Sequence, residues 1–390
     1  MDALAWIDDK LAAHEHAGLL RQLRTYEGST AILIASSGQT VVNFASNDYL
    51  NLAGDPRLST AVREALERQA WGSAASPLIT GHTKYHAELE HDLAEFEKTE
   101  AALVFSSGYA ANVGTITSLV ERGDVILSDA RNHASIIDGC RLSGARIQIY
   151  PHLDMEFLEK MLAQASGFRR RLIVTDSLFS MDGDLAPLDT LVTLAKQFDT
   201  MLMIDEAHAT GVFGQQGRGV AEWYGPHVTE GVHVKVGTLS KALGCAGGFV
   251  AGSTKLIAWL VNRARPYIFS TAQAAPGMAA AQAALQIIRS EPERRHQLLA
   301  TSQQVCETLQ QQGWSVRSNS QIIPIMIGDP SSAVRMSEQL LQQGLMVPAI
   351  RPPSVPEGES LLRLSLSCGH TPEMIDQVLN AFAELSSATA

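Results

Sequence analysis

Short apolar runs alternate with stretches of helical periodicity through the middle of the chain. The runs at 102–105, 125–127, 147–150, 172–175, 201–204, 232–236 and 248–251 are predicted to be strands. Between several of them, as at 109–119 and 188–198, apolar residues recur at the spacing of an amphipathic helix. Short apolar strands separated by helices favour a mainly parallel sheet with both faces covered. The pattern therefore predicts a three-layer α/β domain.

The two ends of the chain have different patterns. An amphipathic helix is predicted near the N-terminus from the apolar positions Trp6, Ile7, Leu11, Leu19, Leu20 and Leu23. A helical stretch at about 275–312 leads to a smaller α/β unit with a strand at 322–326, a helix near 331–343 and a strand at 361–366. We expect an N-terminal segment at 1–50, a large domain at 51–285 and a small C-terminal domain at 286–390.

Composition and charge exclude several classes of protein. The 390 residues are 45% apolar and 18% charged, as in ordinary globular proteins. A net charge of −11 argues against nucleic acid or an anionic membrane as a general partner. The four cysteines form no C-x-x-C pair, so we expect no metal site, no disulfide framework and a reducing, cytoplasmic setting. No signal peptide or membrane-spanning run is recognisable.

Polar residues follow the predicted strands at the same end. Ser107, Asp129, Ser177, Asp205 and Thr238 each stand at or just after the carboxyl end of a strand. In open α/β sheets, ligands bind beyond these carboxyl ends. We therefore expect the functional site along this edge of the sheet.

Three residues at this edge indicate which ligand the site binds. Asp205 ends the run at 201–204, His208 follows three residues later, and Lys241 comes after the run at 232–236. A lysine can hold an aldehyde cofactor as a Schiff base, and a buried carboxylate can pair with a protonated ring nitrogen. The combination suits pyridoxal phosphate. Taken singly, the lysine could be a surface residue, the aspartate a helix N-cap and the histidine a core residue.

Neighbouring residues suit the rest of such a cofactor. Ser107, Gly108 and Tyr109 follow a strand and open a helix, where backbone N–H groups and the helix dipole favour a phosphate. Thr238 could add a hydroxyl to the same phosphate, and His133 is placed to stack on the ring. Small residues also serve any tight strand-to-helix turn, and a histidine also serves in a core.

The glycine-rich stretch at 214–219 has the spacing G-x-x-G-x-G rather than the dinucleotide pattern G-x-G-x-x-G. It also follows His208 and not a predicted strand. We therefore interpret it as a surface loop, and a nucleotide-dependent oxidoreductase is not favoured.

Longer motifs resemble the α-oxoamine synthases, which are fold type I enzymes that use pyridoxal phosphate. The matching stretches are 43–50, 107–112, 180–184, 205–211, 238–241, 349–356 and 362–366. The resemblance covers essentially the whole chain. It implies a fold type I transferase with a large and a small domain, acting as a homodimer with its active site between the subunits.

The resemblance also assigns roles to residues. The catalytic residues it implies are Lys241, His133, Asp205 and His208. The cofactor-binding residues it implies are Ser107, Gly108, Tyr109, His133, Ser180, Asp205, His208, Thr238, Lys241 and Thr271. The substrate-binding residues it implies are Arg21, Asn47, His133, Ser354 and Arg363.

Within these sets, Lys241 would carry the cofactor and move the α-proton of the substrate. Asp205 would keep the ring nitrogen protonated, and His208 would hydrogen-bond the phenolic oxygen. Arg363 would pair with the amino-acid carboxylate in a two-pronged fork, which a lysine could not reproduce. Arg21 and Ser354 would line the acyl entrance, and Ser270 and Thr271 would complete the phosphate site of the partner subunit.

The reaction implied is the decarboxylative condensation of an amino acid with an acyl thioester. The small-domain motifs at 349–356 and 362–366 favour L-alanine with pimeloyl-CoA or pimeloyl-ACP. Glycine with acetyl-CoA is the nearest alternative, and a non-catalytic subunit of the same fold is a more distant one. The sequence leaves open the thioester carrier, the acyl chain length and the choice between alanine and glycine.

Overall fold

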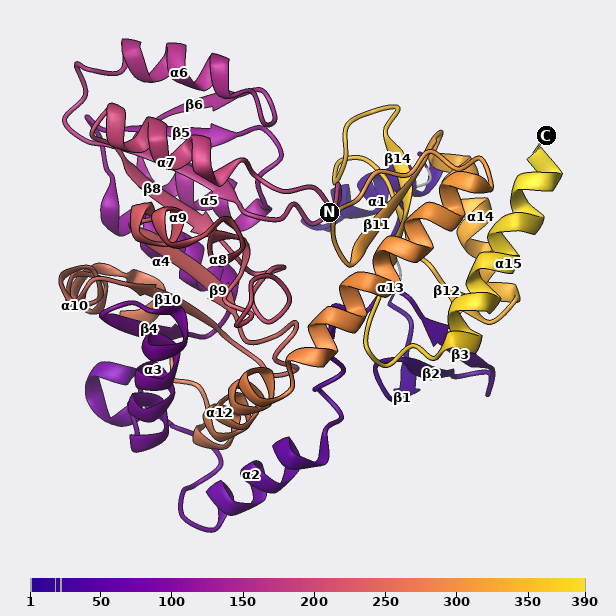
Figure 1. Ribbon diagram of the computed structural model, residues 1–390, viewed down its shortest axis with the longest axis horizontal. Coiled ribbons are helices and arrows are strands. Elements are labelled where there is room, and N and C mark those ends of the chain that lie inside the picture. The colour runs from indigo at the N-terminus through magenta and orange to yellow at the C-terminus, as the bar shows by residue number, and fades with distance from the viewer. Residues whose placement is uncertain (1, 18, 22, 390) are drawn as a thin grey trace.

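A seven-stranded sheet forms the centre of the larger lobe in the computed structural model, which describes residues 2–17, 19–21 and 23–389 (Figure 1). Its strands lie in the order β4 (Ala101–Phe105), β10 (Gly248–Gly252), β9 (Val234–Thr238), β8 (Met201–Asp205), β7 (Arg171–Asp176), β5 (Val125–Asp129) and β6 (Arg146–Tyr150). Neighbours from β9 to β6 are parallel, and β10 is antiparallel to β4 and β9. The connection from β9 to β10, at 239–247, is shorter than the dozen or so residues that a parallel crossover needs.

Both faces of this sheet are covered. On β8, Leu202 and Ile204 belong to one buried cluster, whereas Met203 between them belongs to another, because side chains alternate between the faces of a strand. The first cluster includes residues of α3 (Lys84–Glu97), α6 (Met155–Gln164), α7 (Leu188–Gln197), α8 (Val220–Tyr224), α9 (Pro226–Gly231) and α12 (Ala275–Ser290). The second includes residues of α4 (Gly108–Leu119), α5 (Ala134–Ser143), α10 (Thr254–Arg263) and α11 (Arg265–Ile268). The predicted three-layer, mainly parallel α/β fold is confirmed.

The smaller lobe contains segments from both ends of the chain (Figure 1). One antiparallel sheet has the order β11 (Ile322–Gly328), β14 (Ser360–Ser365) and β13 (Ala349–Ile350). A second sheet has the order β1 (Tyr26–Gly28), β2 (Ile32–Ala35), β3 (Thr40–Asn43) and β12 (Leu345–Met346). The helices of this lobe are α13 (Pro292–Gln311), α14 (Pro330–Gln342) and α15 (Pro372–Thr389).

The pairing of β12 with β3 joins the two ends of the chain. Leu345 lies opposite Val42 and Met346 opposite Asn43, in parallel register. The N-terminal segment therefore shares a sheet with the C-terminal part, a long-range pairing that no local pattern indicates. The domain limits at 50 and 285 stay predictions, and residue 285 falls inside α12 and not at the end of a helix.

The predicted N-terminal helix is shorter than expected. α1 (Trp6–His16) ends before Leu19 and has no buried residue. The positions that would continue its apolar face, 14, 15 and 18, are His, Glu and Gly, so the expected amphipathic helix through residue 23 was wrong. α2 (Pro56–Leu66) and a π-helical turn, η1 (Pro77–Gly81), complete the elements. None of the helices in the described part of the chain is long and apolar enough to cross a membrane.

Candidate active site

Two aspartates end adjacent strands at the carboxyl edge of the large sheet. Asp176 on β7 is the register partner of Asp205 on β8, and both are buried. Asp205 Oδ2 accepts a hydrogen bond from Asn112 Nδ2 at 2.6 Å, and its Oδ1 accepts one from the backbone N of Ala207 at 2.8 Å. These two donors hold the Asp205 carboxylate in a single orientation at the strand end.

Asp176 has an unusual pKa for a carboxyl group. Burial and the charge of Asp205 raise the pKa of Asp176 well above its ordinary value. Asp176 Oδ2 accepts a hydrogen bond from the backbone N of His133 at 2.7 Å. The two adjacent carboxyl groups therefore favour a proton on Asp176. The carboxyl group of Asp176 also holds the backbone of His133 in place.

Lys241 lies in the loop that follows β9. Burial lowers the pKa of Lys241 to about 8, although Asp205 and Asp176 act in the opposite direction. An ordinary lysine has a pKa near 10.4, so few of its molecules are neutral at pH 8. The neutral amine is the form that attacks a carbonyl carbon. The surroundings of Lys241 therefore give it a reactive amine close to neutral pH.

His208 is held by a residue of the N-terminal segment, Tyr49. Its Nδ1 lies 2.6 Å from the hydroxyl of Tyr49, which lies 3.1 Å from Asn47 Oδ1. Burial and the nearby charges of Lys241 and Arg363 lower the pKa of His208 well below its ordinary value, so the ring is neutral. With Nδ1 engaged, Nε2 is the ring nitrogen that remains for a ligand.

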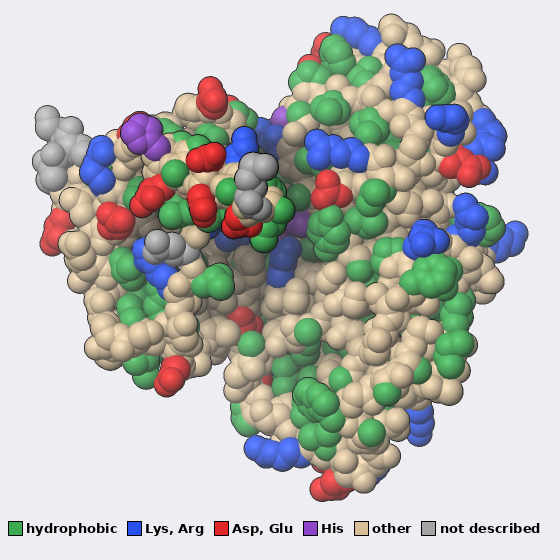
Figure 2. Space-filling view, turned by 180° about the vertical axis from the view of Figure 1, so that it is seen from behind, with side chains coloured by type: hydrophobic (Ala, Val, Ile, Leu, Met, Phe, Trp, Pro, Cys, Tyr) green, Lys and Arg blue, Asp and Glu red, His purple; other side chains and the backbone are tan. Residues whose placement is uncertain are grey.

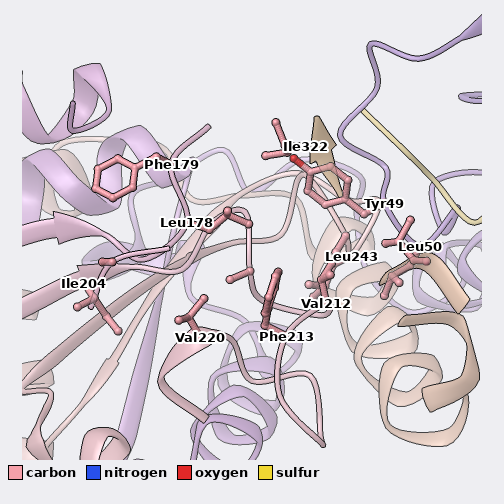
Figure 3. Packing of buried hydrophobic residues seen from close by; sticks show 14 of the residues in the cluster. Tyr49, Leu50, Leu178, Phe179, Ile204, Val212, Phe213, Val220, Leu243 and Ile322 are labelled. Atoms are coloured by element: carbon pink, nitrogen blue, oxygen red, sulfur yellow. The ribbon is translucent and has the colours of Figure 1, made fainter. Parts of the chain in front are cut away.

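The hydroxyl of Tyr49 depends on a buried cluster for its position. Tyr49, Leu243 and Ile322 belong to the same core, contributed by the N-terminal segment, the loop after Lys241 and β11 (Figure 3). Tyr49 has no solvent-exposed surface. The two lobes therefore meet at Tyr49, the residue that contacts His208. Their packing sets the position of the Tyr49 hydroxyl.

The predicted phosphate site is assembled at the start of α4. Ser107 caps the helix, and its Oγ accepts a hydrogen bond from the backbone N of Ala110 at 3.0 Å. A Cβ at Gly108 would lie 3.5 Å from Thr238 Cβ, so the two predicted phosphate residues are adjacent. Thr238 Oγ1 lies 2.8 Å from Ser240 Oγ. A helix N-terminus and two hydroxyl groups therefore converge there.

Tyr109 and Thr271 contribute less directly. The Tyr109 hydroxyl donates a hydrogen bond to Asp138 Oδ2 at 2.7 Å, and its ring is 46% exposed. The phenol is thus committed to α5, and only the backbone of Tyr109 stands at the helix start. Thr271 is exposed and lines a small pocket with Ser106 and Ser270. Its predicted role toward a partner subunit stays a prediction.

His133 lies at the start of α5 with its side chain exposed. Its Nδ1 lies 2.7 Å from Ser135 Oγ, and Ser135 Oγ accepts a hydrogen bond from Asn112 Nδ2 at 2.9 Å. The same asparagine also holds Asp205. Asn112 therefore connects the predicted ring-stacking histidine with the predicted partner of the ring nitrogen.

Arg363 on β14 is a buried cation, with 6% of its surface exposed. Its Nε donates to the carbonyl oxygen of Ser180 at 2.6 Å, its Nη1 to Ser365 Oγ at 2.7 Å and its Nη2 to Asn47 Oδ1 at 3.3 Å. Within the described ranges, no carboxylate forms an ion pair with it. A buried charge without a counter-charge is costly, and a guanidinium pairs well with a carboxylate. Arg363 therefore fits an anionic substrate group.

Arg21 and Ser354 lie together in a pocket of the smaller lobe. Arg351 and Pro352 also line this pocket, and the side chains of Arg21 and Ser354 are exposed. Figure 2 shows that the surface is hollowed between the two lobes. The sequence assigned both residues to the acyl entrance, and that role stays a prediction.

The donor set fits pyridoxal phosphate group by group. Lys241 supplies an amine for the aldehyde, and Asp205 supplies an oriented carboxylate for the ring nitrogen. His208 offers a neutral ring nitrogen to the phenolic oxygen, while Ser107 and Thr238 mark the phosphate end. The residues that would bind each group of the cofactor therefore lie on one edge of the sheet.

Sequence reasoning missed Asn112, Asp176, Tyr49 and Ser240 as site residues. Asn112 and Tyr49 stand inside motifs that matched the family, and Asp176 ends a predicted strand, so a signal was present for each. Their roles arise from contacts with other elements, as between Asn112 on α4 and Asp205 on β8. Such contacts cannot be read from spacing along the chain.

The glycine-rich stretch at 214–219 is not a plain surface loop. Gly217 and Gly219 are buried, and a Cβ at Gly219 would fall 2.5 Å from the carboxylate of Glu206. Glu206 in turn accepts hydrogen bonds from the backbone N of Val220 and of Ala221. The glycines therefore allow the chain to approach a buried carboxylate, which corrects the surface-loop interpretation.

Curated relatives match nearly the whole chain. It is 46% identical over 371 residues to the 8-amino-7-oxononanoate synthase of Geobacter sulfurreducens, covering 94% of each chain. It is 44% identical over 377 residues to the 8-amino-7-oxononanoate synthase of Lysinibacillus sphaericus, covering 96% of each.

Solved structures match the fold equally completely. The serine palmitoyltransferase of Sphingomonas wittichii superposes with a TM-score of 0.93 at 33% identity, covering 100% of this chain and 99% of that one. A structure described as SPT with PLP internal aldimine gives a TM-score of 0.93 at 32% identity, with the same coverage. The sequence profile described as aminotransferase class I and II matches residues 39–382. The chain belongs to the aminotransferase class I and II family, in its α-oxoamine synthase branch.

Proposed function

We propose that the chain catalyses the decarboxylative condensation of L-alanine with a pimeloyl thioester, using pyridoxal phosphate. The products are 8-amino-7-oxononanoate, carbon dioxide and the free thiol, a step of biotin synthesis. The observation that carries the proposal is the buried Arg363, which pairs with no carboxylate among the described residues and lies close enough to lower the pKa of the amine of Lys241. An amino-acid carboxylate at Arg363 would bring the reacting carbon to that amine.

Pyridoxal phosphate, when bound, supplies an electron-withdrawing ring that stabilises negative charge on the α-carbon of the amino acid. Asp205 holds the proton on the ring nitrogen, since a nearby carboxylate favours the charged form of that nitrogen. His208 would meet the phenolic oxygen through Nε2, since Nδ1 is engaged by the Tyr49 hydroxyl. Asn112 and the backbone N of Ala207 keep the Asp205 carboxylate oriented while it acts.

Lys241 moves protons in this mechanism. With a pKa of about 8, its amine accepts the α-proton near neutral pH and returns a proton at the end of the cycle. Arg363 binds the substrate carboxylate through its guanidinium, and Asn47 and Ser180 set the plane of that group. The condensation forms one carbon–carbon bond, expels the thiol and later releases the carboxylate as carbon dioxide.

The names of the relatives support a pimeloyl thioester as the acyl substrate. We propose that this substrate enters through the pocket lined by Arg21 and Ser354. Condensation of serine with a palmitoyl thioester is a second candidate, favoured by the close superposition on serine palmitoyltransferase. The identity of 33% to that enzyme is lower than the 46% to an 8-amino-7-oxononanoate synthase. Glycine with acetyl-CoA is a third combination.

The test is a matrix of thiol-release assays on the purified holoenzyme. Alanine, glycine and serine are each combined with pimeloyl-CoA, pimeloyl-ACP, acetyl-CoA and palmitoyl-CoA. The proposal predicts the highest kcat/KM for alanine with a pimeloyl thioester. A higher value for serine with palmitoyl-CoA, or for glycine with acetyl-CoA, would replace the proposed substrates while keeping the reaction type.

We propose in addition that the chain acts as a homodimer. Leu78, Ile79 and Phe269 are exposed by 50%, 75% and 68% of their surfaces, and clustered exposed apolar residues mark interfaces. Their segments adjoin, because the backbone N of Ala272 donates to the carbonyl oxygen of Ala75 at 2.9 Å. Thr271 stands in the same region, where a partner's cofactor could meet it.

Sedimentation velocity tests the dimer directly. The wild-type chain should sediment as a dimer, and Ile79→Asp should shift it toward the monomer and weaken cofactor binding. A monomeric wild-type protein with full activity would refute the proposal. We also place the reaction in the cytoplasm, which is supported by four cysteines that form no disulfide.

A further inference from the structure

His152 lies in the turn between β6 and α6 and is held between two carboxylates. Its Nδ1 lies 2.8 Å from Asp129 Oδ1, its Nε2 lies 3.0 Å from Asp184 Oδ2, and its side chain is 17% exposed. A carboxylate only accepts hydrogen bonds, so both ring nitrogens must carry protons to make these contacts. Burial opposes this charge, but the two carboxylates outweigh it and raise the pKa of His152 to about 9.

One of these carboxylates is fixed to the large sheet. Asp129 ends β5 and is buried, and its Oδ1 also accepts a hydrogen bond from the backbone N of Arg131 at 2.8 Å. Its Oδ2 accepts one from the backbone N of Leu153, beside His152, at 3.0 Å. The imidazole of His152 is therefore anchored to a rigid strand end and not to a mobile loop.

The other carboxylate belongs to Asp184, whose backbone carbonyl closes the turn formed by residues 179–184. The backbone N of Phe179 donates to the carbonyl oxygen of Asp184 at 3.0 Å, and that of Gly183 donates to the carbonyl oxygen of Phe179 at 2.9 Å. The ring of His152 also meets the ring of Phe179 edge-on, with centroids 4.5 Å apart at 89°. His152 thus contacts both ends of the 179–184 turn.

The 179–184 turn carries the carbonyl group that orients Arg363. Ser180 O accepts the hydrogen bond from Arg363 Nε at 2.6 Å, the shortest of the three that the guanidinium makes to this chain. On the other side of the turn, Gly183 adopts φ +67°, and a Cβ there would lie 2.3 Å from the carbonyl oxygen of Ile322 on β11. A displaced turn would therefore move the guanidinium as well.

We propose that His152 is a positioning residue for the substrate carboxylate, acting through the 179–184 turn on the Ser180 carbonyl and so on Arg363. The inference rests on the proposed role of Arg363 in carboxylate binding. Loss of His152 would leave Lys241, Asp205 and the phosphate-site residues Ser107 and Thr238 in place. It would weaken the binding of the amino acid and leave the acyl thioester unaffected.

A cation site is the competing explanation for this cluster, since His152, Asp182 and Asp184 lie close enough to share an ion. Both ring nitrogens of His152 lie within hydrogen-bond distance of carboxylates, at 2.8 and 3.0 Å, so neither points at an open position for a metal. Asp182 is bonded to Arg131, which also pairs with Glu359 at 2.8 Å. The ring nitrogens of His152 and the carboxylate of Asp182 are therefore already engaged by protein groups.

The test compares His152→Phe with His91→Phe in the holoenzyme. Phenylalanine keeps a ring against Phe179 and removes both hydrogen bonds, while His91 is 71% exposed and pairs with Glu95 on its own helix. For H152F we expect about a tenfold rise in the Kd of L-alanine by calorimetry, a similar rise in its KM, and a change below twofold in the KM of the thioester. H91F should match the wild type.

A double-mutant cycle with Arg363→Lys separates the positioning role of His152 from the carboxylate-binding role of Arg363. If His152 acts through Arg363, H152F should change the Kd of alanine less than twofold in the R363K background, because coupled residues are not additive. Fully additive effects, or an unchanged Kd in H152F alone, would overturn the inference about His152. An unchanged Kd in R363K alone would instead overturn the proposed role of Arg363.

His152→Gln serves if H152F does not fold, as judged by thermal unfolding. Its amide carries both N–H donors on one nitrogen, so it cannot reproduce the two donors that the imidazole places on separate ring nitrogens. An intermediate Kd for alanine, with the thioester KM unchanged, would support the inference. A wild-type Kd for alanine in H152Q would contradict it.

Discussion

The cofactor side and the substrate side of the site are built in different ways. Asp205 and Lys241 follow adjacent parallel strands, β8 and β9, so one piece of sheet places them together. Asn47, Ser180 and Arg363 come from three segments that are distant in the sequence. The guanidinium of Arg363 joins them by hydrogen bonds to Ser180 and Asn47. The chemistry thus depends on local strand-end geometry, whereas recognition of the amino acid depends on how the two lobes are joined.

The largest effect is expected on the cofactor side. Lys241→Ala should reduce turnover by about 10⁴-fold, because it removes both the nucleophilic amine and the proton carrier. The thermal midpoint should hardly change, and Lys84→Ala, at a side chain that is 84% exposed, should behave as the wild type. Thiol release measures the rate. Ordinary turnover in K241A would show that another group carries the chemistry.

Asp205→Asn should have the next largest effect. The amide cannot hold the ring nitrogen protonated, and loss of one preorganised charge at a reacting centre typically costs about 10² to 10³-fold. Exchange of the alanine α-proton in D₂O, followed by NMR, measures the step. The matched control is Asp176→Asn, where the raised pKa already favours a neutral carboxyl group, so the change should stay below tenfold. Equal losses in both variants would remove the distinction between the two aspartates.

The reactivity of Lys241 should depend on pH. Below a pKa of about 8 the amine is protonated and unreactive, so capture of pyridoxal phosphate by the apoprotein should rise with pH and level off above 8. The neutral fraction grows from about 1% at pH 6 to about half at pH 8, which predicts a rise of about fiftyfold. Stopped-flow absorbance follows the capture. A rate that keeps climbing to pH 10 would mean an ordinary lysine.

Substitutions on the substrate side should have smaller effects, and these effects should be confined to the KM of the amino acid. Arg363→Lys should raise the KM of alanine about thirtyfold, since a lysine keeps the charge but loses the fork of donors. Arg335→Lys, at an exposed arginine, is the control. Steady-state kinetics with each substrate varied in turn measure the effect. If the KM of the thioester rises instead, Arg363 belongs to the acyl site.

The same contrast explains which features could be predicted from the sequence. The strands that end in Asp205 and Thr238 are short apolar runs, so their place at one sheet edge followed from pattern alone. The pairing of β3 with β12, the contact of Asn112 with Asp205 and the three bonds of Arg363 depend on long-range packing. The length of the N-terminal helix was overestimated, because apolar residues beyond His16 suggested that its apolar face continued. Local periodicity reports elements, and it does not report which elements meet.

The covalent attachment of the cofactor tests the account most directly. Holoenzyme is reduced with borohydride, digested and mapped by mass spectrometry for a pyridoxyl group on lysine. We expect a single labelled peptide, modified at Lys241. A label on a different lysine, or no label on a protein that turns over, would contradict it.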